Sequence, residues 1–138
     1  MKKFLFAILA LCLVCTFVSA CSDDDSGVID MAAMSEIVRS AEMARIMADP
    51  ENYIGRSFKV RGYYENTFIE EEGKYFHLVI MKDGDSCCPP EGFEFRMASD
   101  SGFPELGATL EMVGVLDRHN DLGPTLYYLF VEDMTILD

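Results

Sequence analysis

Basic residues are scarce in this chain of 138 residues, which has 11 lysines and arginines against 24 aspartates and glutamates. The formal charge is −13 at neutral pH, and removal of residues 1–20, which hold two lysines and no acid, would make it −15. A chain this acidic repels phosphate backbones and anionic lipid. From charge alone we therefore expect no nucleic-acid partner and no attraction between the folded domain and a membrane surface.

Recognisable catalytic motifs are also absent from the sequence. The chain has two histidines, His77 and His119, and the adjacent cysteines Cys87 and Cys88 lack the C-x-x-C spacing that makes zinc sites recognisable. Covalent catalysis needs a nucleophile with a base in reach, and no stretch of the sequence has a pattern typical of such a pair. We therefore expect a protein that is not an enzyme.

The first twenty residues have the three-part layout of a secretory signal. Lys2 and Lys3 form a basic start, residues 4–18 are apolar apart from Thr16, and Ser19 and Ala20 are small. The run is short for a membrane span, which needs about 20 apolar residues. We predict that residues 1–20 are a leader that precedes the folded domain.

The end of this leader, Val18-Ser19-Ala20-Cys21, resembles a bacterial lipobox. The resemblance implies cleavage before Cys21, acylation of that cysteine with chains such as palmitate, and attachment to a membrane on the extracytoplasmic side of a bacterial cell envelope. An uncleaved anchor or a plain secretion signal is the alternative. Residues 21–29 would then be the lipidated cysteine and an acidic tether, which serves either as a spacer or as a surface-export signal.

Residues 30–138 form the predicted domain, and it opens with a helix over residues 30–48. Apolar residues recur at spacings of three and four, with charged residues mostly opposite. The predicted apolar stripe consists of Met34, Ile37, Val38, Ala41, Ala44, Met47 and Ala48. We expect this stripe to fill a contact between the helix and a sheet.

Five alternating segments follow, and they predict strands over residues 57–64, 75–81, 93–97, 109–116 and 126–131, the last extending toward Leu137. The predicted fold is mainly β, a five-stranded OB-like barrel preceded by one amphipathic α-helix. Gly62 and Gly114 suit the bends that such a barrel needs. The alternative is a two-layer sandwich or half-open sheet with the helix packed across it.

Two stretches resemble uncharacterised bacterial lipoproteins with an OB-fold domain. One runs from Tyr53-Ile54-Gly55-Arg56 into Val60-Arg61-Gly62, and the other is Cys87-Cys88-Pro89 followed by Gly92, Glu94 and Phe95. The second departs from the family pattern by one residue, because Pro90-Glu91 stands where one position is usual. The resemblance implies an OB fold and an envelope location, and it implies no settled activity.

The vicinal pair Cys87 and Cys88 allows four interpretations. The thiols are buried structural side chains, a strained and easily reduced vicinal disulfide, ligands of a transition metal together with His77, or partners in an intermolecular disulfide. We expect no other cofactor. A thiol-based metal-binding or redox-responsive protein is thus one functional hypothesis.

The main hypothesis is a lipid-anchored binding or interaction module of the cell envelope. Its binding face would lie on the barrel side near the second and third strands, with Tyr75, Glu94 and Arg96 as candidate contact residues. The expected ligand is a protein or a small molecule.

Overall fold

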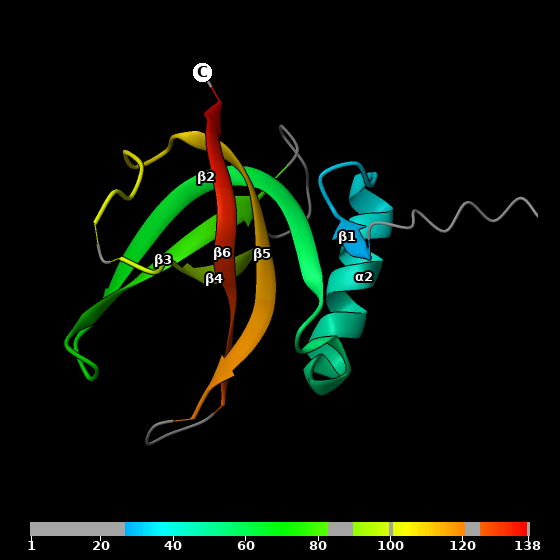
Figure 1. The fold of residues 1–138 in the computed structure, drawn as a ribbon, viewed down its shortest axis with the longest axis horizontal. Coiled ribbons are helices and arrows are strands. Elements are labelled where there is room, and N and C mark those ends of the chain that lie inside the picture. The colour runs from blue at the N-terminus through cyan, green and yellow to red at the C-terminus, as the bar shows by residue number, and fades with distance from the viewer. Residues whose placement is uncertain (1–26, 83–89, 100, 121–124, 138) are drawn as a thin grey trace, which may run out of the picture.

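The computed structural model describes residues 27–82, 90–99, 101–120 and 125–137 (Figure 1). The elements are β1 (Val28–Asp30), α2 (Glu36–Ala48), the 3-10 helix η2 (Pro50–Tyr53), β2 (Ser57–Ile69), β3 (Lys74–Met81), β4 (Glu91–Arg96), β5 (Thr109–His119) and β6 (Leu126–Leu137). Among the described residues, no helix is both long and apolar enough to span a membrane.

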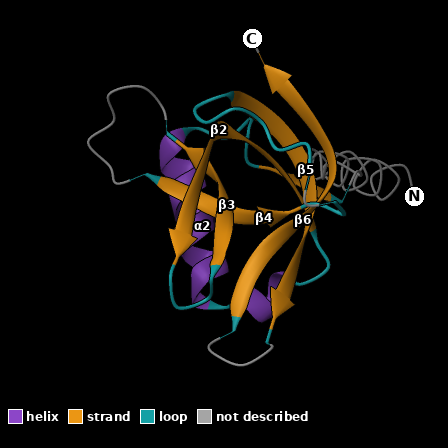
Figure 2. Ribbon diagram, turned by 90° about the vertical axis from the view of Figure 1, so that its left-hand side faces the viewer, coloured by secondary structure: helices purple, strands orange, loops and turns teal. Residues whose placement is uncertain are grey.

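Five of the strands close into a barrel (Figures 1 and 2). The order is β2-β3-β4-β6-β5, and β5 pairs back with β2 to complete the ring. The β4–β6 pairing is parallel, whereas the other pairings of the ring are antiparallel. A closed five-strand barrel with one helix before it confirms the predicted fold class, and this small Greek-key barrel is the OB architecture.

The long strand β2 belongs to two sides of the barrel. Its first half pairs with β5 and its second half with β3, and Tyr63 takes part in both pairings. Gly62 sits at this change of partner. A Cβ at Gly62 would lie 2.7 Å from the carbonyl carbon of Ile80, so only glycine allows β2 and β3 to approach this closely.

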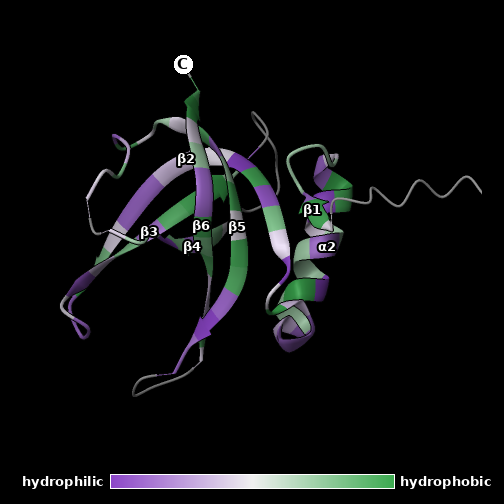
Figure 3. Cartoon of the chain, viewed as in Figure 1, coloured by the Kyte–Doolittle hydropathy of each residue, from purple (hydrophilic) through white to green (hydrophobic). Residues whose placement is uncertain are grey.

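The core lies inside the barrel and receives a buried side chain from every barrel strand. Buried and more exposed residues alternate along the first half of β2, where Figure 3 shows hydrophobic and hydrophilic residues alternating. The buried core residues are Met31, Met43, Ile46, Phe58, Val60, Tyr64, Val79, Met81, Phe93, Phe95, Leu110, Met112, Leu116 and Leu129. Full burial of one such side chain contributes about 1.5–3 kcal/mol, so this cluster is the main source of stability.

The predicted orientation of the first helix is wrong. The side that α2 turns to the barrel carries Arg39, Met43 and Ile46, and the predicted apolar stripe is exposed except for Met34, which packs against the core before α2 begins. Ile37 is 83% and Met47 71% exposed. Residues 39, 43 and 46 follow the i, i+4, i+7 spacing of one helical face. The stripe prediction missed this face because it counted Arg39 as a solvent residue, although the aliphatic stem of arginine can pack in a core.

The start of the domain also differs from the prediction. Residues 28–30 form β1, which pairs in parallel with residues 57–59 of β2, and α2 begins only at Glu36, after Ser35. The side chain of Asp30, the first residue of the predicted helix, accepts a hydrogen bond from the amide of Ala33 in the connecting turn. Three residues are too few for an alternating pattern to be visible, which explains why β1 was not predicted.

Candidate binding pocket on the β3–β4 face

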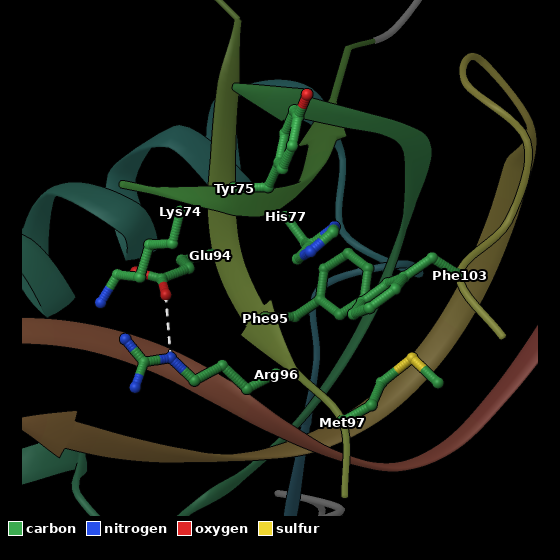
Figure 4. Close-up of a pocket in the computed structure, with 8 residues that line it drawn as sticks. All are labelled: Lys74, Tyr75, His77, Glu94, Phe95, Arg96, Met97 and Phe103. Carbon is green, nitrogen blue, oxygen red and sulfur yellow. Dashed lines mark hydrogen bonds and ion pairs between the residues drawn. The ribbon is translucent and has the colours of Figure 1, made fainter. Parts of the chain in front are cut away.

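A pocket of about 600 Å³ opens over β3 and β4. These strands are neighbours in the barrel, with Leu78 opposite Glu94. Figure 4 shows the lining side chains, which are Lys74, Tyr75, His77, Glu94, Phe95, Arg96, Met97 and Phe103. Counted from β2, these are the second and third strands of the barrel, the face on which OB domains bind oligonucleotides and oligosaccharides.

The inner wall of the pocket is an aromatic cluster around His77. The ring of Phe103 stacks on His77 with centroids 3.6 Å apart and planes inclined by 5°. Phe95 lies at a centroid distance of 6.3 Å from His77, and its own side chain is fully buried. A flat, rigid wall of this kind suits the face of a ring.

A hydrogen-bond chain behind this wall sets the orientation of His77. The hydroxyl of Tyr64 lies 2.7 Å from Nδ1 of His77, and Nδ2 of Asn66 donates to the same hydroxyl oxygen at 3.3 Å. Tyr64 is 2% exposed, so the chain is shielded from water. One ring nitrogen of His77 is therefore engaged by the protein itself.

The opposite side of the pocket is charged. Nε of Arg96 donates to Glu94 Oε1 at 2.9 Å, and the guanidinium carbon lies 4.2 Å from the ring centroid of Tyr128. Burial and the nearby carboxylate of Asp117 raise the pKa of Tyr128, so this ring stays neutral beneath the guanidinium. A guanidinium held by a carboxylate and an aromatic face has a fixed orientation, because both contacts depend on its planar shape.

Lys74 adds a second cation at the outer end of the pocket. Its Nζ lies 2.8 Å from the carboxylate of Glu72 and 5.0 Å from the ring centroid of Phe76. Next to it, Tyr75 is 58% exposed and its ring lies 5.0 Å from that of Phe68, which is 49% exposed. This outward aromatic pair extends the apolar surface beyond the pocket.

The structure brings together four of the site residues singled out from the sequence. Tyr75, Glu94 and Arg96, the candidate binding face, line the same pocket as His77. His77 was predicted as a metal or redox residue, whereas here it contacts Tyr64 and Phe103. Among the described residues, no group of three or more histidine, cysteine, aspartate or glutamate side chains is arranged to hold a metal.

The cysteine predictions fall on segments outside the described residues. Cys87 and Cys88 lie between residues 82 and 90, and the predicted lipidation site Cys21 precedes residue 27. The four interpretations of the vicinal pair and the acylation of Cys21 stay predictions.

Sequence reasoning missed half of the pocket lining, namely Lys74, Phe95, Met97 and Phe103. Phe95 and Met97 alternate with Glu94 and Arg96 and were placed on the other face of the strand. The pocket includes both residues because it extends along β4 to the end of the strand and on to Met97, the residue after it. Phe103 lies in the next connection, and no local pattern indicates that it stacks on His77.

No family model and no curated protein matches the chain. Among solved structures, the chain is similar to a dimeric structure of the N-terminal domain of PriB protein from Thermoanaerobacter tencongensis, with 15% sequence identity and a TM-score of 0.39. The match covers 59% of this chain and 96% of that chain.

The expectation that net charge excludes nucleic acid as a partner is wrong, because the lining of the β3–β4 pocket does not share the acidic balance of the chain. The physical reason is that formal charge averages over the whole chain. The pocket itself places Lys74 and Arg96 beside aromatic rings, which are the residue types with which OB barrels hold single strands. A net charge of −13 therefore does not exclude this class of ligand.

Proposed function

We propose that the protein is a lipid-anchored binding module of the bacterial cell envelope whose OB barrel binds its ligand in the β3–β4 pocket. The observation that carries the proposal is the pocket itself, which has Arg96 on one side and the aromatic cluster around His77 on the other, on the ligand-binding strands of an OB barrel. The shape and side chains of the pocket support a ligand built from rings that carry anionic groups.

Two groups of lining residues would contact two parts of such a ligand. Phe103 and His77 offer a flat stack for the face of a ring, and Arg96 and Lys74 offer N–H donors for its anionic group. Arg96 is already oriented by Glu94 and Tyr128, so less side-chain entropy is lost when a ligand binds.

The proposal is binding without catalysis. Glu94 is paired with Arg96 and Nδ1 of His77 with Tyr64, and these contacts support a positioning role for both groups. A general base needs access to a substrate proton at hydrogen-bond distance. Incubation of a bound ligand with the protein should therefore return it chemically unchanged, as checked by mass spectrometry.

Binding is tested on the chain from residue 22 onward. Every side chain of the described core lies between Ile29 and Met134, so this chain keeps the whole barrel and α2. Calorimetric titration with a short oligothymidylate, an oligogalacturonate and a neutral cello-oligosaccharide separates phosphate-bearing, carboxylate-bearing and uncharged ring chains. We expect one of the two anionic probes to bind and the neutral one to bind more weakly.

The matched variants are Arg96→Ala and Arg61→Ala. Both arginines contact a strand glutamate, since Arg61 lies 2.6 Å from Glu111, but Arg61 does not line the β3–β4 pocket. Loss of a charge-assisted hydrogen bond should weaken binding by about tenfold or more in Arg96→Ala, and Arg61→Ala should bind normally. Equal weakening in both variants, or no binding of either anionic probe, would contradict the proposed pocket.

The anchor is tested separately in cells. The signal-like leader and the lipobox-like residues before Cys21 support it. Palmitate labelling of the full chain should be lost in Cys21→Ser and retained in Cys87→Ser/Cys88→Ser. Labelling that survives Cys21→Ser would refute acylation at this cysteine while leaving the binding pocket untouched.

A further inference from the structure

A second, smaller pocket of about 240 Å³ lies where β2 changes partner from β5 to β3. Its lining comes from the turn before α2, from α2, from β2 and β5, and from the residue after β3. The lining residues are Ala32, Arg39, Arg61, Gly62, Tyr63, Lys82 and Thr109. No described residue lines both this pocket and the β3–β4 pocket, so the two sites are separate.

The charge of this pocket is opposite to that of the chain. Among the described residues, the lining holds three cations and no acid, whereas the whole chain has 11 basic and 24 acidic residues. Like charges gathered at one pocket repel one another, and an anion placed between them relieves that repulsion. The pocket is therefore a local site of attraction for an anion on a chain that is acidic overall.

Arg61 contributes least to this attraction, because its guanidinium already binds a carboxylate. Nε and Nη2 of Arg61 donate to Glu111 Oε2 at 3.1 and 2.6 Å, and Nζ of Lys59 lies 3.0 Å from the other carboxylate oxygen. Glu111 does not line the pocket. We therefore treat Arg61 as part of the wall, and Arg39 and Lys82 as the cations that an anion would contact.

Arg39 lies at the inner side of the pocket. It is on the face of α2 that is turned to the barrel, and it is 6% exposed. A guanidinium has five N–H donors in a planar fork, so it can bind an anion in addition to contacts within the protein. The attraction between opposite charges is also stronger at a buried position, where less water screens it.

We propose that this pocket binds a small oxyanion of the phosphate class, held by Arg39 on the side of α2 and by Lys82 at the end of β3. A phosphate group carries a charge of about −1.5 to −2 at neutral pH, which matches these two cations, and it has three acceptor oxygens. Tyr63 and Thr109 also line the pocket, and their hydroxyl groups are donors for the remaining oxygens.

The volume of the pocket favours a small ligand. Pockets that hold drug-sized molecules begin at about 300 Å³, and this one is smaller. A single phosphate group, either as the free ion or at the end of a small molecule, suits this volume better than the chain of rings proposed for the β3–β4 pocket. The inference thus concerns a second site and does not rest on the proposed function.

Phosphate binding is tested by NMR on the chain from residue 22. Inorganic phosphate is titrated at constant ionic strength while ¹⁵N–¹H spectra are recorded. We expect saturable shifts at the amides of Gly62, Tyr63 and Thr109, and a chloride titration should give none there. Glycerol 3-phosphate is the second probe. Tighter binding of this ester than of inorganic phosphate would assign the anion to a larger molecule, weaker binding would assign it to the free ion, and either result supports the site.

Arg39→Met and Lys82→Ala should each weaken phosphate binding about tenfold or more, because each removes a charged donor. The matched controls are Arg45→Met, which changes an exposed arginine of the same helix, and Lys59→Ala, which changes a lysine outside the pocket. Both controls should bind phosphate as wild type does. Lys82 is exposed, so its variant gives a result even if Arg39→Met does not fold. The absence of saturable shifts at this pocket, or equal weakening in variants and controls, would overturn the proposal.

Discussion

At the residue scale, the pocket depends on side chains that are positioned by groups behind them. Arg96 is held by Glu94 and Tyr128, and His77 is held by Tyr64 and Phe103. Since Tyr64 also belongs to the buried core, the aromatic wall is coupled to the stability of the barrel. Changes at Tyr64 should therefore affect the wall and the core together.

Tyr64→Phe tests this coupling. The variant keeps the ring and removes the hydroxyl, so His77 Nδ1 and Asn66 Nδ2 lose their shared partner. We expect a loss of about 1–2 kcal/mol in the free energy of unfolding, measured by urea denaturation. Tyr75→Phe removes a hydroxyl from an exposed ring and should change stability by less than about 0.5 kcal/mol. Equal losses in the two variants would show that the buried hydroxyl has no special role.

Glu111 gives a prediction for pH dependence. Hydrogen bonds from Arg61 and then Lys59 lower the pKa of Glu111 below its ordinary value of 4.5. A carboxylate whose folded pKa is lowered contributes stability that is fully present above the unfolded pKa and is lost as pH falls through the folded pKa. Because the pairs are partly exposed, the contribution is about 1 kcal/mol or less.

Glu111→Gln should therefore be less stable than wild type near neutral pH, and the difference should shrink as pH falls below 4.5. Urea denaturation of both proteins across this range measures it. A difference that is constant with pH would show that the charge of Glu111 is not what stabilises the contact between β2 and β5.

At the element scale, β2 is the strand that closes the barrel, because it pairs with β5 and with β3. The close approach at Gly62 lets the second half of the strand pair with β3, where the pocket lies. The position of this glycine thus connects barrel closure to the binding face.

Gly62→Ala should strain this close approach. The added Cβ would meet backbone atoms of Ile80, which cannot move aside as a side-chain tip can, and such overpacking costs about 1–3 kcal/mol or more. Gly114→Ala is a comparison variant with a milder clash, since its Cβ would lie 3.0 Å from the nearest atom, the carbonyl oxygen of Phe130. Thermal melts should rank wild type above Gly114→Ala and Gly114→Ala above Gly62→Ala. The reverse order of the two variants would contradict the proposed role of Gly62.

At the scale of the whole molecule, the charge of −13 is the dominant electrostatic feature. Like charges repel one another in the compact state, and salt screens this repulsion within a Debye length of about 10 Å at 0.1 M. The ion pairs Arg45–Glu42, Lys74–Glu72 and Arg118–Glu51 each have at least one exposed partner and contribute little to stability. Repulsion should therefore outweigh attraction in the salt response.

We expect the melting temperature to rise when sodium chloride is added. Differential scanning calorimetry of the chain from residue 22 measures this temperature over a series of salt concentrations. A melting temperature that falls with added salt would mean that the surface ion pairs stabilise the fold by more than the net repulsion destabilises it.

The sequence by itself determined the number of barrel strands and where they lie along the chain. Alternation along a strand is local, because successive side chains point to opposite faces whatever the rest of the chain does. The same local signal placed Tyr75, Glu94 and Arg96 on neighbouring strands. The OB class and part of the pocket lining could therefore be predicted from sequence alone.

Tertiary structure alone decided which face of α2 packs on the barrel and which loop residue completes the pocket. Arg39 turns inward with Met43 and Ile46, and Phe103 meets His77 from another part of the chain. Both outcomes depend on contacts between residues far apart in sequence, where shape and burial outweigh local polarity. An apolar helical stripe predicts a contact with the barrel, and only the fold decides which face of the helix makes that contact.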